Sequence, residues 1–72
     1  MEFKALVAKN LETLILASGK TKMQIANELG VKSSAISKFV YGTALPSPEN
    51  IKKLCLILNC EYTDIMGSLE VK

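Results

Sequence analysis

Apolar residues recur every three or four positions near the start of the chain. This spacing places them on one face of a helix, and Gly19 stands where that helix would end. The pattern predicts a helix over residues 2–18 whose apolar face lies in the core, with a groove for a partner as the alternative. The recurring residues are Phe3, Leu6, Val7, Leu11, Leu14 and Ile15.

The stretch from Thr21 to Gly42 predicts two short helices joined by a tight turn. Thr21 can cap the first helix, because its hydroxyl accepts a bond from an otherwise unpaired backbone N–H. Gly30 adopts without strain the left-handed conformation that commonly ends a helix. The two helices are expected over residues 22–29 and 33–41. Their inner faces carry Ile25, Ala26 and Leu29 in the first helix and Ile36, Phe39 and Val40 in the second.

The sequence predicts that a fourth helix begins after a loop over residues 42–47. Ser47 can cap a fourth helix, with Pro48 at the first helical position. Asn59 can end that helix, and residues 61–66 predict a short fifth one. The sequence therefore predicts an all-α fold of five helices.

The chain of 72 residues is long enough for one small domain, in which every helix must contribute to a single core. We expect this domain over residues 1–67, with a tail over residues 68–72. The longest apolar run covers residues 54–58, far short of the roughly 20 residues that span a bilayer. No signal-peptide pattern is present, so a cytoplasmic location and no membrane partner are expected.

The net charge is +2, from nine lysines and seven acidic residues, and the sequence contains no arginine. This mildly basic balance permits nucleic-acid binding without requiring it. Arginine is the usual bidentate reader of guanine, so lysine would have to replace it as a point charge.

The two cysteines, Cys55 and Cys60, are expected to fill small positions in the core. A reducing cytoplasm disfavours a disulfide between them. The sequence contains no histidine and offers too few clustered ligands for a metal site. No activating base accompanies either cysteine. We therefore expect no metal, no catalytic residue and no enzyme activity.

Ala26 precedes Gly30 by one helical turn, and a small residue there lets the next helix cross closely. This arrangement is typical of a helix-turn-helix, whose second helix enters the DNA major groove. An ordinary helical hairpin within a core has the same spacing. The spacing alone therefore leaves both interpretations open.

One long motif starts at Thr21 and reads T-K-x-x-I-A-x-x-L-G-V-K-x-S-x-I-S-K-F-x-x-G. With the residues C-terminal to it, the motif resembles the Cro-type phage-repressor helix-turn-helix family, the XRE family, over residues 5–67. The resemblance implies a five-helix fold like that of lambda repressor, in which the second and third helices form the helix-turn-helix. The matching positions are Thr21, Ala26, Leu29, Gly30, Val31, Ile36, Ser37, Lys38, Gly42, Pro46, Leu54, Leu58 and Ile65.

The resemblance implies binding to double-stranded DNA through the third helix. If Ile36 points inward, Lys38 and Tyr41 point outward at 100° per residue. Without the resemblance, Lys38 would be an ordinary surface lysine. The residues expected near base edges are Ser33, Ser34 and Lys38. Those expected near phosphates are Lys22, Lys32, Ser37 and Thr43.

The sequence departs from the family pattern in several places, one of which is Lys22, where a glutamine usually follows the first threonine. The family commonly pairs an arginine in the first helix with a glutamate in the third, but Ile15 and Val40 occupy the matching positions. Replacing both charges with apolar groups is often neutral or stabilising, so we expect these two side chains to touch. Lys32 stands where a capping serine or threonine is common, which makes Ser33 the candidate cap in its place.

These features predict a sequence-specific transcriptional regulator, similar to small Cro-like repressors, that binds a palindromic operator as a homodimer. Two recognition helices would then enter major grooves about 34 Å apart. No cofactor and no small-molecule ligand are expected, because the domain takes up nearly all of the chain. The candidate dimer surface consists of Leu56, Ile57, Cys60 and Tyr62, which would otherwise complete the core.

A protein-interaction module on the same fold is the alternative. It would be an antitoxin-like partner binder or an antagonist of a related regulator. The weak charge, the lack of arginine and the short side chains on the third helix favour this alternative. Strongly salt-dependent binding to duplex DNA would count against it.

Overall fold

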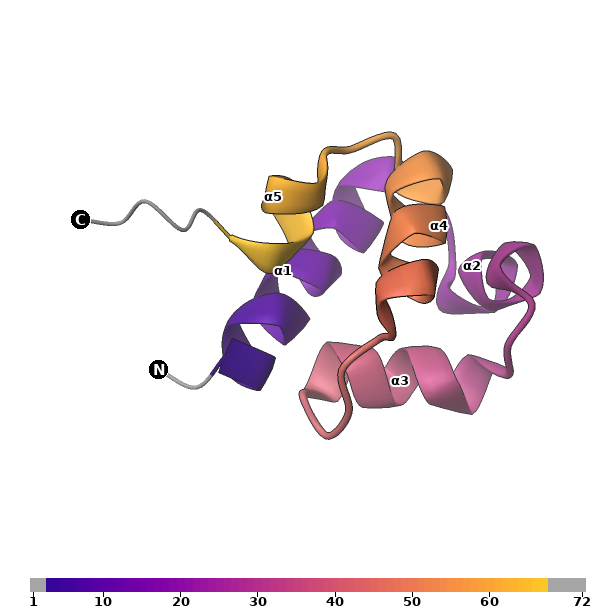
Figure 1. Ribbon diagram of the computed structural model, residues 1–72. Helices are drawn as coiled ribbons and strands as arrows, with labels where there is room; N and C mark the ends of the chain where they lie inside the picture. The colour runs from indigo at the N-terminus through magenta and orange to yellow at the C-terminus, as the bar shows by residue number, and fades with distance from the viewer. Residues whose placement is uncertain (1–2, 68–72) are drawn as a thin grey trace.

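The computed structural model describes residues 3–67 and contains five helices, as the sequence predicts (Figure 1). Their bounds are α1 Phe3–Ser18, α2 Lys22–Leu29, α3 Ser33–Tyr41, α4 Pro48–Leu58 and α5 Tyr62–Met66. The described residues form no strand, which confirms the all-α class. The bounds of α2 and α3 match the expected ones. Residue 2 and the expected tail lie outside the described residues.

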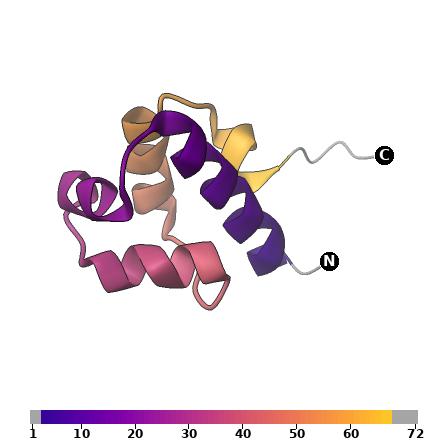
Figure 2. The ribbon, with the colours of Figure 1, turned by 180° about the vertical axis from the view of Figure 1, so that it is seen from behind.

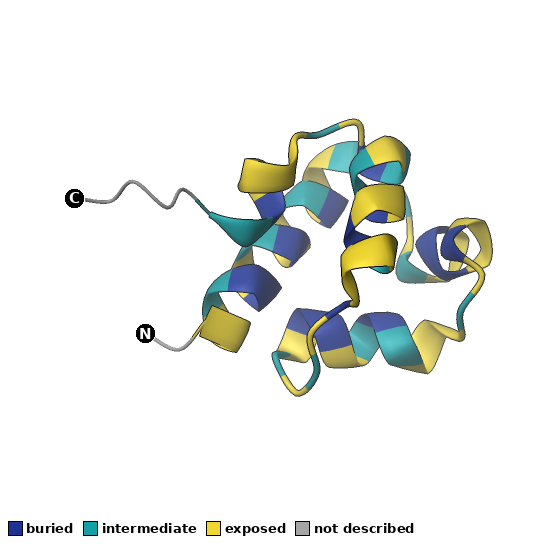
Figure 3. Ribbon diagram, in the orientation of Figure 1, coloured by how far each residue is buried: buried dark blue, intermediate teal, exposed yellow. Residues whose placement is uncertain are grey.

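The helices surround one core. Helix α3 packs against both α1 and α2, and α5 packs against α1 and α4. Figure 1 shows α4 and α5 in front of α1, and Figure 2 shows α1 from the other side. Each helix turns its buried residues toward the interior (Figure 3). The core residues are Val7, Leu11, Ile15, Ile25, Ala26, Leu29, Ile36, Phe39, Val40, Ile51, Leu54, Leu58 and Ile65.

The buried face of α1 is narrower than its apolar spacing predicts. Phe3 is 47% exposed, while Leu6 and Leu14 are half-buried. Phe3 stands at the first turn of α1, where the other helices cover the surface less completely. Ala8, which the periodicity did not select, is buried because the end of α3 lies against it. A Cβ atom on Gly42 would lie 3.6 Å from the Cβ of Ala8.

The starts of α2 and α4 agree with the capping predictions. The backbone N–H of Gln24 donates to Thr21 Oγ1 at 3.0 Å, and the N–H of Thr21 donates to Gln24 Oε1 at 2.8 Å. This reciprocal pair satisfies two backbone donors at the start of α2. Ser47 Oγ accepts from the N–H of Asn50 at 3.2 Å, and Pro48 is the first residue of α4.

The turn between α2 and α3 is set by Gly30, whose φ is +86°. The N–H groups of Gly30 and Val31 both donate to the carbonyl of Ala26, at 2.8 and 3.0 Å. Lys32 is then extended and forms the N-cap of α3 without a side-chain hydrogen bond. The expectation that Ser33 caps α3 is therefore wrong. The compact turn leaves one extended residue before the helix, so Ser33 is already helical.

The turn between α4 and α5 has the same backbone pattern. Asn59 is left-handed, with φ of +56°, and the N–H of Cys60 donates to the carbonyl of Cys55 at 2.9 Å. Glu61 is extended and forms the N-cap of α5. Its N–H donates to Asp64 Oδ2 at 2.9 Å, which closes the first turn of the helix.

Ile15 and Val40 are 6% and 7% exposed and belong to the same core. The core therefore accepts apolar side chains where the family commonly has an ion pair, and direct contact between the two stays a prediction. Within residues 3–67 no polar or charged residue is buried. The helices of this range are all too short or too polar to cross a membrane.

Candidate nucleic-acid interface

Helix α3 is amphipathic in the expected sense. Ile36, Phe39 and Val40 are buried, at 1%, 8% and 7% exposure. The opposite face carries short polar groups and one lysine. Ser33, Ser34 and Lys38 are exposed, as are Lys32 at its N-cap and Tyr41 at its end, whereas Ser37 is half-buried. The residues expected to approach base edges thus lie on one outward face of a helix whose other face is fixed in the core.

Helix α2 packs against the buried side of α3. Ala26 is 2% exposed and belongs to the core that both helices share. Lys20 adds a polar brace that sequence reasoning missed. Its Nζ lies 2.9 Å from Glu28 Oε1 and donates to the carbonyl of Ile57 at 3.2 Å. The brace links α2 to the C-terminal end of α4, where a cation also interacts favourably with the helix dipole.

Lys22 and Tyr41 come together across the α2–α3 unit. The ammonium of Lys22 lies 5.4 Å from the centroid of the Tyr41 ring, which is the range of a cation–π interaction. The outward position of Tyr41 can be derived from helical spacing, but its pairing cannot. The two residues are nineteen positions apart in the sequence, and only the crossing of α2 and α3 joins them.

Thr43 has a structural role that the sequence did not reveal. Its backbone N–H donates to the carbonyl of Lys38 at 3.0 Å, and its Oγ1 donates to the same carbonyl at 3.2 Å. Thr43 therefore caps the C-terminal end of α3. Its hydroxyl would have to leave this carbonyl before it could donate to a DNA phosphate.

The charged residues within α3 and the turns on either side of it are all lysines. The sequence contains no acidic residue between Glu28 and Glu49, whereas Lys32 and Lys38 fall inside that interval. Lys22 joins them from the start of α2 through its contact with Tyr41. A surface of this kind attracts polyanions even when the net charge of the whole chain is small.

The cysteines pack as the sequence predicts. Cys55 and Cys60 are free thiols that lie half-buried against the core. Burial raises the pKa of the Cys60 thiol to about 11, with contributions from Cys55, Asp64 and Glu61. A thiol with a raised pKa stays protonated at neutral pH and is a poor nucleophile. Within residues 3–67, no three metal-binding side chains cluster together.

The candidate dimer residues are unequally exposed. Leu56 is 83% exposed and Tyr62 is 53% exposed, whereas Ile57 and Cys60 are half-buried against the core. A role of this surface in a dimer therefore stays a prediction. Two side chains complete the core, and two extend into solvent.

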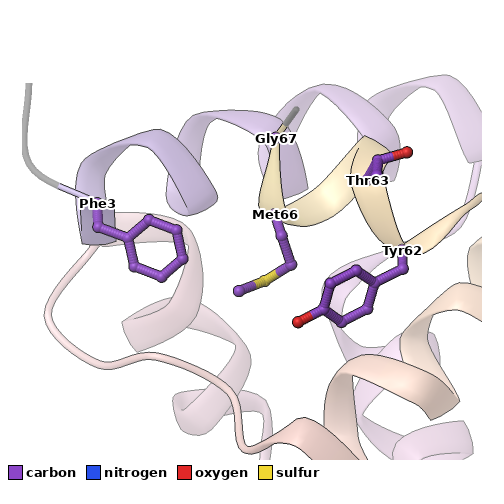
Figure 4. A pocket seen from close by; sticks show the side chains of 5 residues that line it. All are labelled: Phe3, Tyr62, Thr63, Met66 and Gly67. Atoms are coloured by element: carbon purple, nitrogen blue, oxygen red, sulfur yellow. The ribbon is translucent and has the colours of Figure 1, made fainter. Parts of the chain in front are cut away.

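An apolar pocket beside Tyr62 was not predicted. It has a volume of about 230 Å³ and lies between the first turn of α1 and α5 (Figure 4). Phe3, Tyr62 and Met66 point toward it, and Thr63 and Gly67 complete the lining. The residues come from opposite ends of the described chain, so local spacing carries no signal for it.

Comparison with known proteins identifies the family to which this five-helix fold belongs. A family model described as helix-turn-helix matches residues 11–65, which is most of the chain, and confirms the resemblance found in the sequence. The solution structure of the SOS-response transcriptional repressor LexA from Eubacterium rectale superposes with a TM-score of 0.85 and 26% sequence identity. That match covers 97% of this chain and 74% of the LexA chain.

A curated relative matches at similar identity. Antitoxin PezA from Streptococcus pneumoniae serotype 4 (strain ATCC BAA-334 / TIGR4) is 29% identical over 62 residues. The match covers 86% of this chain but only 39% of the antitoxin. The chain thus spans about two fifths of the length of this relative.

Proposed function

We propose that this chain, which belongs to the helix-turn-helix family, is a sequence-specific transcriptional regulator that binds a palindromic DNA operator as a homodimer. It would act in the cytoplasm and without enzymatic activity. One observation carries the proposal. The exposed face of α3 is polar, includes Lys38, and lies in an interval of sequence without acidic residues.

The proposed base contacts come from Ser33, Ser34 and Lys38. These side chains share the exposed face of α3, and an α-helix fits the major groove. Lys38 is the longest of the three, and its ammonium can donate to the acceptors of guanine. Serine hydroxyls bond to several bases and discriminate weakly. We therefore infer that DNA shape contributes much of the specificity.

The proposed phosphate contacts surround these residues. Lys22 stands at the start of α2, Lys32 at the N-cap of α3, and Ser37 beside the base-reading face. Thr43 lies at the far end of α3, where its backbone and hydroxyl are engaged with Lys38. Phosphate contacts of this kind fix the register of the protein on DNA without reading its sequence.

A homodimer would extend the short recognition surface. One nine-residue helix reads only a few base pairs, whereas two related by a two-fold axis read a palindrome. The proposed interface includes Leu56, Ile57, Cys60 and Tyr62. The exposure of Leu56 and Tyr62 supports this choice, and the pocket beside Tyr62 offers more apolar area to bury. Ile57 and Cys60 would contribute at the edge.

A protein-interaction module is the second candidate. The sequence similarity to antitoxin PezA supports it, as does the exposure of Leu56. In this case the fold would present its α4–α5 surface to a different protein. DNA binding and partner binding could also occur together in one chain.

Selection from a randomised duplex library tests the proposal. The purified chain is mixed with the library near physiological salt, and bound fragments are sequenced. We expect enrichment of a two-fold symmetric site with half-sites about one helical turn apart. Retention without a motif, lost at modest added salt, would indicate non-specific contact. The protein-interaction candidate would then lead.

The oligomeric state is tested in parallel by sedimentation of the free and DNA-bound protein. We expect two chains on each selected site. Leu56→Lys should weaken pairing, because it places a charge on an apolar surface. Leu16→Lys is the matched control, since Leu16 is similarly exposed but lies on α1. Equal effects of both variants would count against the proposed surface.

A further inference from the structure

The Lys22–Tyr41 contact has no evident role in the core. Tyr41 is 74% exposed, and its ring belongs neither to the core nor to the residues packed against it. The Lys22 ammonium is held over this ring at 5.4 Å. Packing in the core therefore does not explain why this exposed ring holds a cation beside the candidate DNA surface.

The dipoles of α2 and α3 both favour the position of the Lys22 ammonium over the Tyr41 ring. Lys22 is the first residue of α2, where the positive end of the helix dipole repels a cation. Tyr41 is the last residue of α3, where the negative end attracts one. The negative face of the aromatic ring adds to that attraction. The side chain of Lys22 is therefore drawn away from its own helix toward the end of α3.

We infer that Tyr41 is a positioning residue that holds the Lys22 ammonium in place for a DNA phosphate. This inference rests on the proposed DNA-binding function. Ser37 precedes Tyr41 by one helical turn and shares its side of α3. The paired side chains thus flank the face that carries Lys38. A phosphate beside α3 would meet a cation that is already ordered.

The advantage of this arrangement is entropic. A lysine side chain that is free in solution loses rotamer freedom when it binds a phosphate. A lysine that already rests on an aromatic ring has lost part of that freedom before binding, so its contact is stronger. The ring needs its face for this purpose and does not need its hydroxyl. Phenylalanine at position 41 should therefore preserve this role of tyrosine, whereas leucine should abolish it.

A double-mutant cycle tests the inference. The probe is a fluorescent duplex of mixed sequence, because phosphate contacts do not depend on sequence. We expect Tyr41→Leu to weaken binding by about two- to fivefold, the range of an exposed cation–π contact. Tyr41→Phe should bind as the unaltered chain does. In a Lys22→Met background, Tyr41→Leu should have no further effect.

Salt dependence gives a second readout. Lys22→Met should lower the slope of log affinity against log salt by about one, the value for one phosphate contact. Lys52→Met on α4 is the matched control and should leave the slope unchanged, since Lys52 lies on the exposed side of α4. Thermal unfolding of each variant confirms that the fold is retained.

Several outcomes would overturn the inference while leaving the proposed function intact. Tyr41→Leu would weaken binding equally with and without Lys22 if the ring acts alone. Tyr41→Phe would weaken it as much as leucine if the hydroxyl makes the contact. In the free protein, proton NMR should show the Lys22 ε-methylene shifted upfield by the ring, and an unshifted signal also contradicts the inference. If the unaltered chain binds no duplex, the proposed function fails and the inference fails with it.

Discussion

Two turns in this chain have the same backbone conformation, but the helices that follow them present surfaces of different chemistry. The α2–α3 and α4–α5 connections each begin with a left-handed residue, Gly30 or Asn59. In both, the next N–H donates to a carbonyl in the last turn of the preceding helix. In both, one extended residue then precedes the next helix. The backbone alone therefore does not distinguish the candidate recognition turn from the other.

The two turns differ in the length and charge of the helix to which each one leads. Lys32 precedes α3, which has nine residues and no acidic side chain. Glu61 precedes α5, which has five residues and contains Asp64. The first turn leads to a surface that suits an anion, and the second leads to an acidic and apolar one. A helix-turn-helix backbone thus supplies geometry, while its second helix determines whether DNA is a suitable partner.

The largest expected effect tests whether both turns belong to one folding unit. Ile25 in α2 and Ile65 in α5 are both fully buried, at 0% exposure. Each change to alanine should lower the free energy of unfolding by about 2–5 kcal/mol, because it leaves a cavity. Urea unfolding measures both. A much smaller loss for Ile65→Ala would mean that α5 is only loosely attached to the core.

The next effect tests the chemical difference between the two helices. Lys38→Ala on α3 should weaken binding to the selected operator by about tenfold, since a base contact is worth about 1–3 kcal/mol. Discrimination at one base position should fall as well. Lys53→Ala on the exposed side of α4 is the control and should change little. Full discrimination by the Lys38 variant would show that another group reads the DNA.

A smaller effect compares the two left-handed residues directly. Gly30→Ala should lower the free energy of unfolding by about 1–2 kcal/mol, because an ordinary side chain is strained at φ of +86°. The added Cβ itself meets no atom within 4 Å, so the loss would come from the backbone alone. Asn59→Gly should cost nothing, since glycine accepts the same conformation. A loss in Asn59→Gly as large as that in Gly30→Ala would contradict this account.

The last comparison concerns Cys60, which follows the left-handed Asn59. The folded state raises the pKa of the Cys60 thiol to about 11, so the unfolded thiol loses its proton at lower pH. The unfolded state then binds fewer protons than the folded state, and stability falls as the pH rises from about 9 to 11. Cys60→Ser should remove this part of the decline in urea unfolding. An unchanged pH profile would exclude a contribution from Cys60.

Most of the fold is predictable because local signals agree along the chain. Thr21, Gly30 and Ser47 mark helix ends through short-range hydrogen bonds and backbone preferences, and apolar spacing then assigns the buried faces. The exposure of Phe3 was missed because periodicity does not report where the other helices stop covering α1. The capping role assigned to Ser33 was wrong because spacing does not give the length of a turn.

The candidate site is predictable only in part. Helical geometry places Lys38 and Tyr41 on the exposed face of α3, and the structure agrees. The Lys22–Tyr41 contact depends on how two helices cross, which local spacing does not contain. The same holds for the brace from Lys20 to the carbonyl of Ile57. The assigned base and phosphate contacts remain proposals, because they depend on a bound duplex.

The short side chains of α3 have a consequence for chemically modified DNA. Ser33 and Ser34 reach only a little way beyond the backbone, so a helix that reads bases with them must sit deep in the major groove. Cytosine methylation adds a methyl group at carbon 5, and that group projects into the same groove. A deeply seated helix leaves little room for it. If α3 binds as proposed, methylated operators should be bound less tightly at positions beneath these serines, and the regulator would respond to the modification state of its own site.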